Sequence, residues 1–152
     1  MHRAVSTLIL LASLSLAAQT PPDWADPSPH QKRLVNVGPD ASVEVLDWGG
    51  TGRTLVLLSQ LGQTAHIYDD WAPRLATAFH VLGITRRGYG ESKTAASGYS
   101  MERLASDIVA VLDAAKVEKP VLVGNGFAGE EMTWVGARYP VRVAGLIYLD
   151  AA

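Results

Sequence analysis

A short apolar run that meets three closely spaced glycines constrains the fold of this chain more than any other feature. Residues 120–131 are P-V-L-V-G-N-G-F-A-G-E-E. The apolar run at 121–123 is too short for a helix and is bounded by proline and glycine, which indicates a buried strand. A segment of helical character follows the glycines Gly124, Gly126 and Gly129 directly. The stretch therefore predicts a strand, a tight turn and a helix in immediate succession.

This succession is the geometry of a nucleophile elbow, the G-x-S-x-G turn that exposes a catalytic serine at the edge of a sheet. Glycines flank the serine because the turn is strained and neighbouring backbone comes close. In this chain the frame runs from Gly124 to Gly129, and Gly126 stands at the position of the serine. The sequence predicts the turn but places no nucleophilic atom in it.

Composition limits the classes of protein to which the chain can belong. Its 152 residues, 48% hydrophobic and 18% charged, suffice for one domain with a real core and exclude a disordered chain. A net charge of -2 gives no reason to expect nucleic acid as a partner. The absence of cysteine excludes disulfides and thiolate catalysis. Histidines and carboxylates show no usable metal-ligand spacing, so we expect neither a metal nor a cofactor.

The first 18 residues have the pattern of a secretory signal peptide. His2 and Arg3 form a basic start, residues 4–18 are uncharged and largely apolar, and Ala17 suits cleavage. The run is shorter than the roughly 20 residues of a membrane span, so we expect export to the periplasm or medium rather than a stable membrane anchor. A buried N-terminal helix is the alternative. Residues 19–33 contain four prolines and predict an extended linker before a domain at 34–152.

Within this domain, short apolar runs alternate with segments of helical periodicity. The runs that predict strands are 34–37, 42–48, 54–58, 80–84, 121–123 and 143–149. The segments that predict helices are 67–78, about 101–115 with Ser100 as N-cap, and about 127–139 with Pro140 as the stop. The alternation of apolar and polar residues in 42–48 predicts a hairpin with one covered face. From residue 54 onward, the order predicts an α/β fold with a mostly parallel sheet and helices on both faces.

In this order and spacing the segments resemble the N-terminal half of an α/β-hydrolase. The resemblance covers residues 34–152 and rests on L-V-L-L-S-Q-L-G, R-R-G-Y-G-E-S, V-G-N-G-F-A-G-E-E and V-A-G-L-I-Y-L-D-A-A. It implies an α/β-hydrolase fold that is truncated after the strand at 143–149. The alternative is a dinucleotide-binding G-x-G-x-x-G motif. It is disfavoured because the glycines do not follow the first parallel strand, and because the strand before Asp150 already fits the hydrolase order.

The resemblance implies acyl transfer on ester-like or other small carbonyl substrates. In the family an elbow serine attacks, a histidine takes its proton and an acid orients the histidine. Carried over, the nucleophile position is Gly126, the oxyanion donors are the amides of Phe127 and of Leu61 or Gln60, and Asp150 is a candidate acid. Every histidine of the chain precedes the elbow, so none fills the family's histidine position.

Other polar residues near these loops have ordinary structural interpretations. Arg86 and Arg87 are expected to form loop ion pairs, although contact with an acidic ligand is the alternative. His66 is expected to be structural. Glu131 lies in the first turn of a helix, where negative charge favours the helix dipole.

Three interpretations of function remain open. The chain is an incomplete or damaged hydrolase, a non-enzymatic pseudo-hydrolase that binds a ligand, or an enzyme that runs another reaction on this fold. Two further departures are Asn125, where relatives often have histidine, and the pair Ser59-Gln60, where relatives usually have His-Gly or Pro-Gly. If the chain ends at residue 152, the strand 143–149 is an exposed apolar edge, and we expect self-association.

Overall fold

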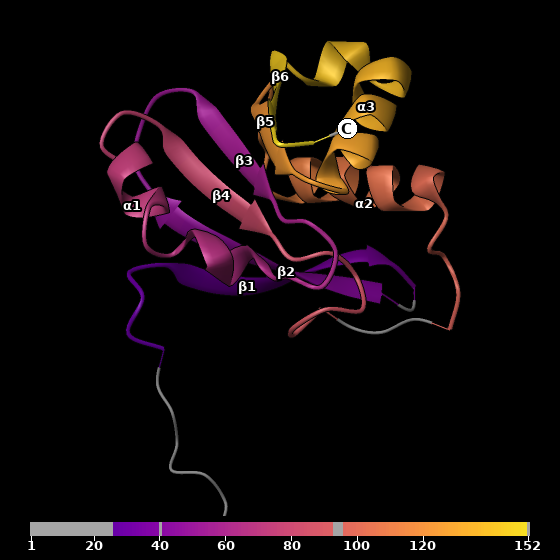
Figure 1. Cartoon of the computed structure of the whole chain (residues 1–152), viewed down its shortest axis with the longest axis horizontal. Coiled ribbons are helices and arrows are strands. Elements are labelled where there is room, and N and C mark those ends of the chain that lie inside the picture. Colours follow the sequence, from indigo (N-terminus) through magenta and orange to yellow (C-terminus); the bar gives the residue numbers. More distant parts are fainter. Residues whose placement is uncertain (1–25, 40, 93–95, 152) are drawn as a thin grey trace, which may run out of the picture.

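A six-stranded sheet organises the computed structural model, which describes residues 26–39, 41–92 and 96–151 (Figure 1). The strands are β1 (Gln31–Gly38), β2 (Ala41–Gly49), β3 (Thr54–Leu58), β4 (His80–Ile84), β5 (Val121–Asn125) and β6 (Gly145–Leu149). Their order across the sheet is β1-β2-β4-β3-β5-β6. Strand β2 pairs antiparallel with both β1 and β4, whereas β4, β3, β5 and β6 run parallel. The predicted signal peptide at 1–18 lies outside the described residues.

Helical segments cover both faces of the sheet, as predicted. The helices α2 (Met101–Ala114) and α3 (Ala128–Arg138) pack on one face (Figure 1). The short η1 (Ala65–Tyr68) and α1 (Ala72–Leu75) pack on the other. Each face has its own apolar core cluster. Within the described part of the chain, no helix has the length and apolarity that a membrane span requires.

Local sequence signals account for the ends of the main helices. The side chain of Ser100 accepts a hydrogen bond from the amide of Arg103 at 3.3 Å, which satisfies a free N–H of the first turn. Helix α3 ends at Arg138, and Pro140 begins the short 3₁₀ turn η2 (Pro140–Arg142). The predicted N-cap and the predicted stop are therefore confirmed.

The prediction of one helix over residues 67–78 is wrong. The segment contains η1, a break at residues 69–71, and α1. Pro73 explains the break, because a continuous α-helix requires residue 73 to donate its N–H to the carbonyl of Asp69, and proline has none. Proline is tolerated instead in the first turn of α1, where no such bond is needed.

The prediction of a single covered face for the hairpin is also wrong for β2. Val43 and Val45 are buried on one side, and Glu44 and Leu46 are buried on the other. The second side is covered because η1 packs against β2 there. Strand β1 begins at Gln31, where the predicted linker still ran, because Gln31 to Arg33 pair with β2. Strand β6 begins at Gly145, two residues later than predicted.

Candidate functional site

The turn between β5 and α3 has the geometry of a nucleophile elbow. Gly126 follows the strand with φ +55°, a left-handed conformation that favours glycine. The amide of Gly129 donates to the carbonyl of Gly126 at 2.9 Å, which closes the first turn of α3. The predicted succession of strand, tight turn and helix is confirmed.

Gly124 is needed because β5 and α3 come into close contact. A Cβ atom at this position would lie 2.7 Å from Sδ of Met132 and 3.0 Å from Cβ of Ala128. Both neighbours are buried against the sheet. A side chain at residue 124 would therefore push α3 away from the strand that positions the elbow.

The space that a side chain at residue 126 would occupy contains Gln60. A Cβ atom built on Gly126 would lie 2.5 Å from Oε1 of Gln60 and 2.8 Å from its Cβ. Contacts this short do not occur between real atoms, so a serine at 126 and the present conformation of Gln60 exclude each other. Gln60 and Gly126 are each recognisable in the sequence as departures from the family pattern. Their proximity in space is not, because it depends on how the two loops pack together.

The three amides predicted as oxyanion donors lie in these two loops. Gln60 and Leu61 follow β3, and Phe127 follows Gly126. Across the described residues, none of the three amides donates a hydrogen bond to a protein group. This is the state expected of amides that bind a ligand oxygen, and their role as oxyanion donors stays a prediction.

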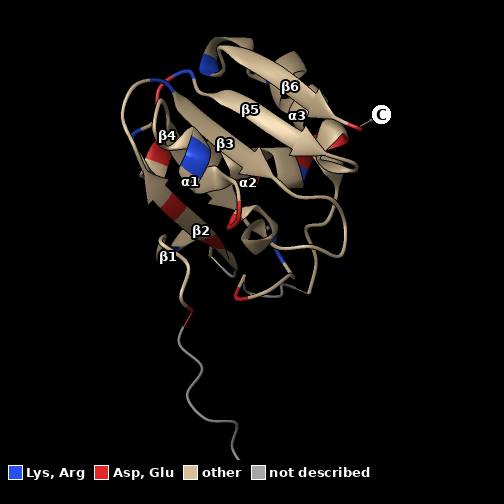
Figure 2. Ribbon diagram, turned by 60° about the vertical axis from the view of Figure 1, so that its left-hand side comes forward, with Lys and Arg blue, Asp and Glu red and all other residues tan. Residues whose placement is uncertain are grey.

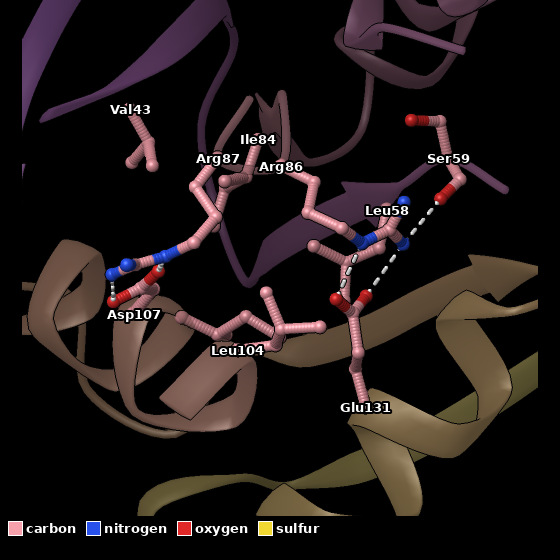
Figure 3. Close-up of a pocket in the computed structure, with 10 residues that line it drawn as sticks. Val43, Leu58, Ser59, Ile84, Arg86, Arg87, Leu104, Asp107 and Glu131 are labelled. Atoms are coloured by element: carbon pink, nitrogen blue, oxygen red, sulfur yellow. Dashed lines mark hydrogen bonds and ion pairs between the residues drawn. The ribbon is translucent and has the colours of Figure 1, made fainter. Parts of the chain in front are cut away.

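Arg86 joins the loop after β3 to the elbow helix (Figure 3). Its Nε donates to Oε1 of Glu131 at 2.5 Å and its Nη2 donates to Oε2 at 2.7 Å. Nη2 also donates to the carbonyl of Ser59 at 2.9 Å. The guanidinium carbon lies 5.1 Å from the centre of the Phe127 ring. Arg86 therefore positions both loops that carry the predicted amides.

The prediction of an ion pair for Arg86 is confirmed, whereas its burial and its partner were not predicted. Arg86 and Glu131 are 8% and 3% exposed, so the pair is part of the interior and not a surface loop contact. Glu131 does lie in the first turn of α3, as predicted. Its main contact is nevertheless Arg86, which sequence periodicity cannot reveal.

Arg87 forms a second buried pair, with a residue that the sequence analysis missed. Its Nε and Nη2 donate to the two carboxylate oxygens of Asp107 at 2.5 and 2.7 Å. Asp107 lies on the apolar side of α2, three residues after Leu104 and one before Ile108. A charged residue inside an apolar stripe was the signal that could have identified it.

A cavity of about 20 Å³ lies between the two ion pairs (Figure 3). Its lining includes Ser59, Arg86, Leu104 and Glu131. A cavity of this size holds about one water molecule, so it is too small to be a substrate pocket.

Tyr68 anchors the end of β3, just before the Ser59-Gln60 loop. Its hydroxyl donates to the carbonyl of Leu58 at 2.8 Å. Burial raises the pKa of Tyr68 to about 12, against a smaller opposite effect of the Arg86 charge. The hydroxyl is therefore a constant, neutral donor at physiological pH.

Asp150 directly follows β6, at the carboxyl edge of the parallel strands. It is exposed and has φ +47°. Nδ2 of Asn125 donates to the carbonyl of Leu149 at 3.2 Å, which ties the ends of β5 and β6 together. In the described ranges, the carboxylate of Asp150 has no hydrogen-bond or ion-pair partner, and its role as the acid stays a prediction.

His66 contacts three carboxylates, those of Asp26, Glu44 and Asp69, as a structural histidine would. Its Nε2 lies 3.3 Å from Oε1 of Glu44 and its Nδ1 lies 3.1 Å from Oδ2 of Asp69. Burial lowers the pKa of His66, but the hydrogen bonds and charges of Glu44 and Asp69 outweigh it and raise the pKa above its usual value. The sequence spacing predicts no grouping of histidines and carboxylates. The structure corrects this, because Asp26 and His30 join His66 and Asp69 in one cluster.

Comparisons with known proteins agree with the geometry of the elbow. A family model of the alpha/beta hydrolase fold matches residues 53–152. A fluoroacetate dehalogenase of Burkholderia sp. is 31% identical over 125 residues, which are 79% of this chain and 40% of that protein. A bifunctional esterase/perhydrolase of Acinetobacter calcoaceticus is 36% identical over 76 residues, which are 47% of this chain and 28% of that protein.

Solved structures show the same architecture. The structure of an N-acyl homoserine lactone degrading enzyme superposes with a TM-score of 0.74 and 32% identity. The match covers 78% of this chain and 45% of that one. The chain thus spans less than half the length of each of these three proteins. Their names describe different reactions, so the likeness establishes a fold and a family and leaves the substrate open.

Proposed function

Since this chain belongs to the α/β-hydrolase family, we propose that it keeps the frame of an acyl-transfer site but does not hydrolyse esters in the form given by its sequence. The observation that carries the proposal is the position of Gln60, whose side chain occupies the space of the missing nucleophile at Gly126. Acyl transfer requires an attacking oxygen, and neither Gly126 nor an amide side chain supplies one. The substrate class of the complete protein is proposed from the family, as ester-like or other small carbonyl compounds.

The free amides of Gln60, Leu61 and Phe127 favour a second candidate function. Amides that point at one place bind a carbonyl or carboxylate oxygen whether or not a nucleophile is present. A pseudo-hydrolase that binds small carbonyl compounds or carboxylates without turnover would therefore use the same loops. Gly126 and Gln60 suit this role, because Gln60 takes the place of a nucleophile while the three amides donate to no protein group in the described part of the chain.

Turnover of short p-nitrophenyl esters tests the proposal. We expect the purified full chain to hydrolyse them no faster than the same sample after heat denaturation. Amide shifts measured by NMR during a titration with butyrate distinguish the two candidates. Shifts of Gln60 and Phe127 without turnover indicate a binding protein. A rate that scales with protein concentration and falls in an Asp150→Asn variant would contradict the proposal.

We also propose that copies of this chain associate through β6, which lies at one edge of the described sheet. Figure 2 shows that neither β5 nor β6 carries a charged residue. Ile147 and Tyr148 are 47% and 43% exposed, and an uncharged apolar edge is a template for strand pairing.

Sedimentation velocity at several concentrations tests this association. We expect the chain to form dimers or larger species, and Ile147→Lys to shift it to monomer because a charge on the edge opposes strand pairing. Val141 is also exposed but precedes the strand, so Val141→Lys is the matched control. A monomer at all concentrations, or equal shifts in sedimentation for the two substitutions, would contradict association through β6.

Export is proposed from the pattern of residues 1–18 alone, which lie outside the described residues. Expression of the full gene in a bacterial host, followed by N-terminal sequencing of the periplasmic fraction, tests it. Export predicts a chain that begins after Ala17. A full-length chain confined to the cytoplasm would refute it.

A further inference from the structure

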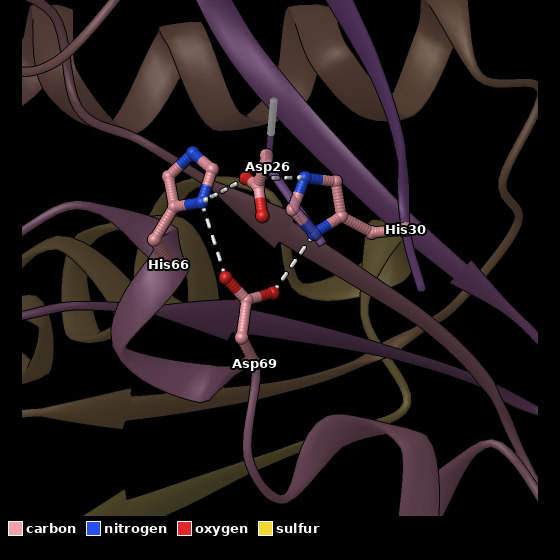
Figure 4. A group of neighbouring side chains, drawn as sticks. All are labelled: Asp26, His30, His66 and Asp69. Atoms are coloured by element: carbon pink, nitrogen blue, oxygen red, sulfur yellow. Dashed lines mark hydrogen bonds and ion pairs between the residues drawn. The ribbon is translucent and has the colours of Figure 1, made fainter. Parts of the chain in front are cut away.

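Four side chains that take no part in the elbow converge beside η1 (Figure 4). They are Asp26 and His30, which precede β1, and His66 and Asp69, which lie in and just after η1. One potential ligand atom from each lies within 4.8 Å of all the others. Figure 4 shows the two carboxylates between the two imidazole rings.

Close contacts between carboxylates and imidazoles hold the cluster together. Oδ1 of Asp69 lies 2.8 Å from Nδ1 of His30, and Oδ2 of the same carboxylate lies 3.1 Å from Nδ1 of His66. Oδ2 of Asp26 lies 3.3 Å from Nδ1 of His66 and 3.4 Å from Nε2 of His30. Four ligands held about 2.0–2.1 Å from a tetrahedral zinc ion are roughly 3.3 Å apart, and the contacts of Nδ1 of His66 with the two carboxylates, at 3.3 and 3.1 Å, match this spacing. His30 faces Asp26 through Nε2 and Asp69 through Nδ1, so it would bind the ion through one of these two nitrogens. Two imidazoles and two carboxylates are also a donor set that suits zinc and similar divalent ions.

A second layer of contacts orients these side chains. Nε2 of His66 faces Oε1 of Glu44 at 3.3 Å, and Glu44 is 1% exposed. Glu44 is fixed in turn by the hydroxyl of Thr85, which donates to Oε2 at 2.6 Å. Nε1 of Trp48 donates to Oδ1 of Asp69 at 3.0 Å. Metal ligands in proteins are typically oriented by such partners, a carboxylate behind a histidine above all.

The orientation of His66 directs Nδ1 at the carboxylates of Asp26 and Asp69. If Nε2–H donates to Glu44, the lone pair of Nδ1 points toward Asp26 and Asp69. Three groups rich in electrons then face one another, and a positive charge between them, either a bound metal ion or a proton on His66, makes the arrangement favourable. The cluster is reachable from solvent, because the His66 and Asp26 side chains are 32% and 24% exposed.

We propose that Asp26, His30, His66 and Asp69 bind one divalent transition-metal ion of the zinc type. Four protein ligands leave no open position, so the ion has a structural role: it fastens the segment before β1 to the segment around η1. The inference is independent of the proposed function, since none of the four residues belongs to the elbow or its loops.

Titration of the full chain with Zn²⁺, after removal of metals by a chelator, tests the site. We expect binding of one equivalent by calorimetry and a higher melting temperature with the ion present. Asp69→Asn and His66→Gln should each weaken binding by at least about 100-fold, since even second-layer changes weaken metal sites by 10–100-fold. His80→Gln is the matched control, because His80 also pairs with an aspartate, Asp47, at 3.1 Å but lies outside the cluster.

The ligand-field absorption of bound Co²⁺ tests the site without any substitution. A four-coordinate site predicts the intense visible bands of tetrahedral cobalt, and Zn²⁺ should displace them. This result holds even if a variant fails to fold. Absence of one-equivalent binding would overturn the proposal and leave the cluster as a network of hydrogen bonds and ion pairs. So would equal affinities in the wild type, Asp69→Asn and His66→Gln.

Discussion

Replacement of Arg86 by methionine is expected to lower the free energy of unfolding by about 3–5 kcal/mol, because it leaves a buried carboxylate without its partner. That carboxylate is Glu131, which is 3% exposed and receives two hydrogen bonds from Arg86. The substitution also removes the donor to the carbonyl of Ser59. Denaturant unfolding followed by circular dichroism measures the change.

A double variant keeps this prediction testable if Arg86→Met does not fold. Arg86→Met with Glu131→Leu removes both charges, and an apolar pair of similar volume is expected to recover most of the loss. The control is Arg142→Met, which breaks a surface pair with Asp113 and should cost less than about 1 kcal/mol. If Arg86→Met lowers the free energy of unfolding no more than Arg142→Met does, the claim that the buried pair stabilises the two loops is contradicted.

Restoration of the family's serine by Gly126→Ser is expected to destabilise the chain, and to do so less when Gln60 is shortened as well. The left-handed φ of +55° alone costs roughly 1–3 kcal/mol for a residue with a side chain. The new Cβ would also meet Oε1 and Cβ of Gln60 at 2.5 and 2.8 Å. Oε1 can swing away, but Cβ is fixed to the backbone, so the loop after β3 must shift.

A double-mutant cycle with Gln60→Gly separates the two contributions. The cost of Gly126→Ser should fall by about 1–2 kcal/mol in the Gln60→Gly background, since the two residues are in direct contact. Gly49→Ser is the matched control for backbone strain, because Gly49 has φ +74° with open space around its Cβ position. Its cost should be the same with either residue at position 60. Equal costs of Gly126→Ser in the two backgrounds would contradict the contact.

Much of the fold could be predicted because local patterns determine it. The apolar run at 54–58 and the periodicity after Ser100 predict β3 and α2 within one residue of their observed bounds. Gly124 and Gly126 predict the elbow, because glycine is the residue type best suited to these two positions. Gly124 lets α3 come close to β5, and Gly126 adopts the left-handed conformation of the turn. Where one local signal opposes another, as at Pro73, the missing N–H of proline outweighs the apolar periodicity and divides the segment.

The contacts that define the site could not be predicted, because they join segments far apart in the chain. The apolar stripe of α2 indicates that Asp107 is buried but does not identify its partner, Arg87. The burial of Glu44 likewise has no evident reason until Thr85 is placed beside it. Gln60 and Gly126 are recognisable singly as departures from the family. Their shared space is a property of the assembled sheet, where β3 and β5 are neighbours.

The central feature of the site is that Gln60 stands where a nucleophile would be. Nuclear Overhauser contacts between the side chain of Gln60 and the two α protons of Gly126 test it most directly. We predict strong contacts from the Gln60 β protons, because its Cβ lies beside the Cβ position of residue 126. If Gln60 shows contacts to solvent-exposed neighbours only and none to Gly126, its side chain does not occupy the position of the nucleophile, and the claim is contradicted.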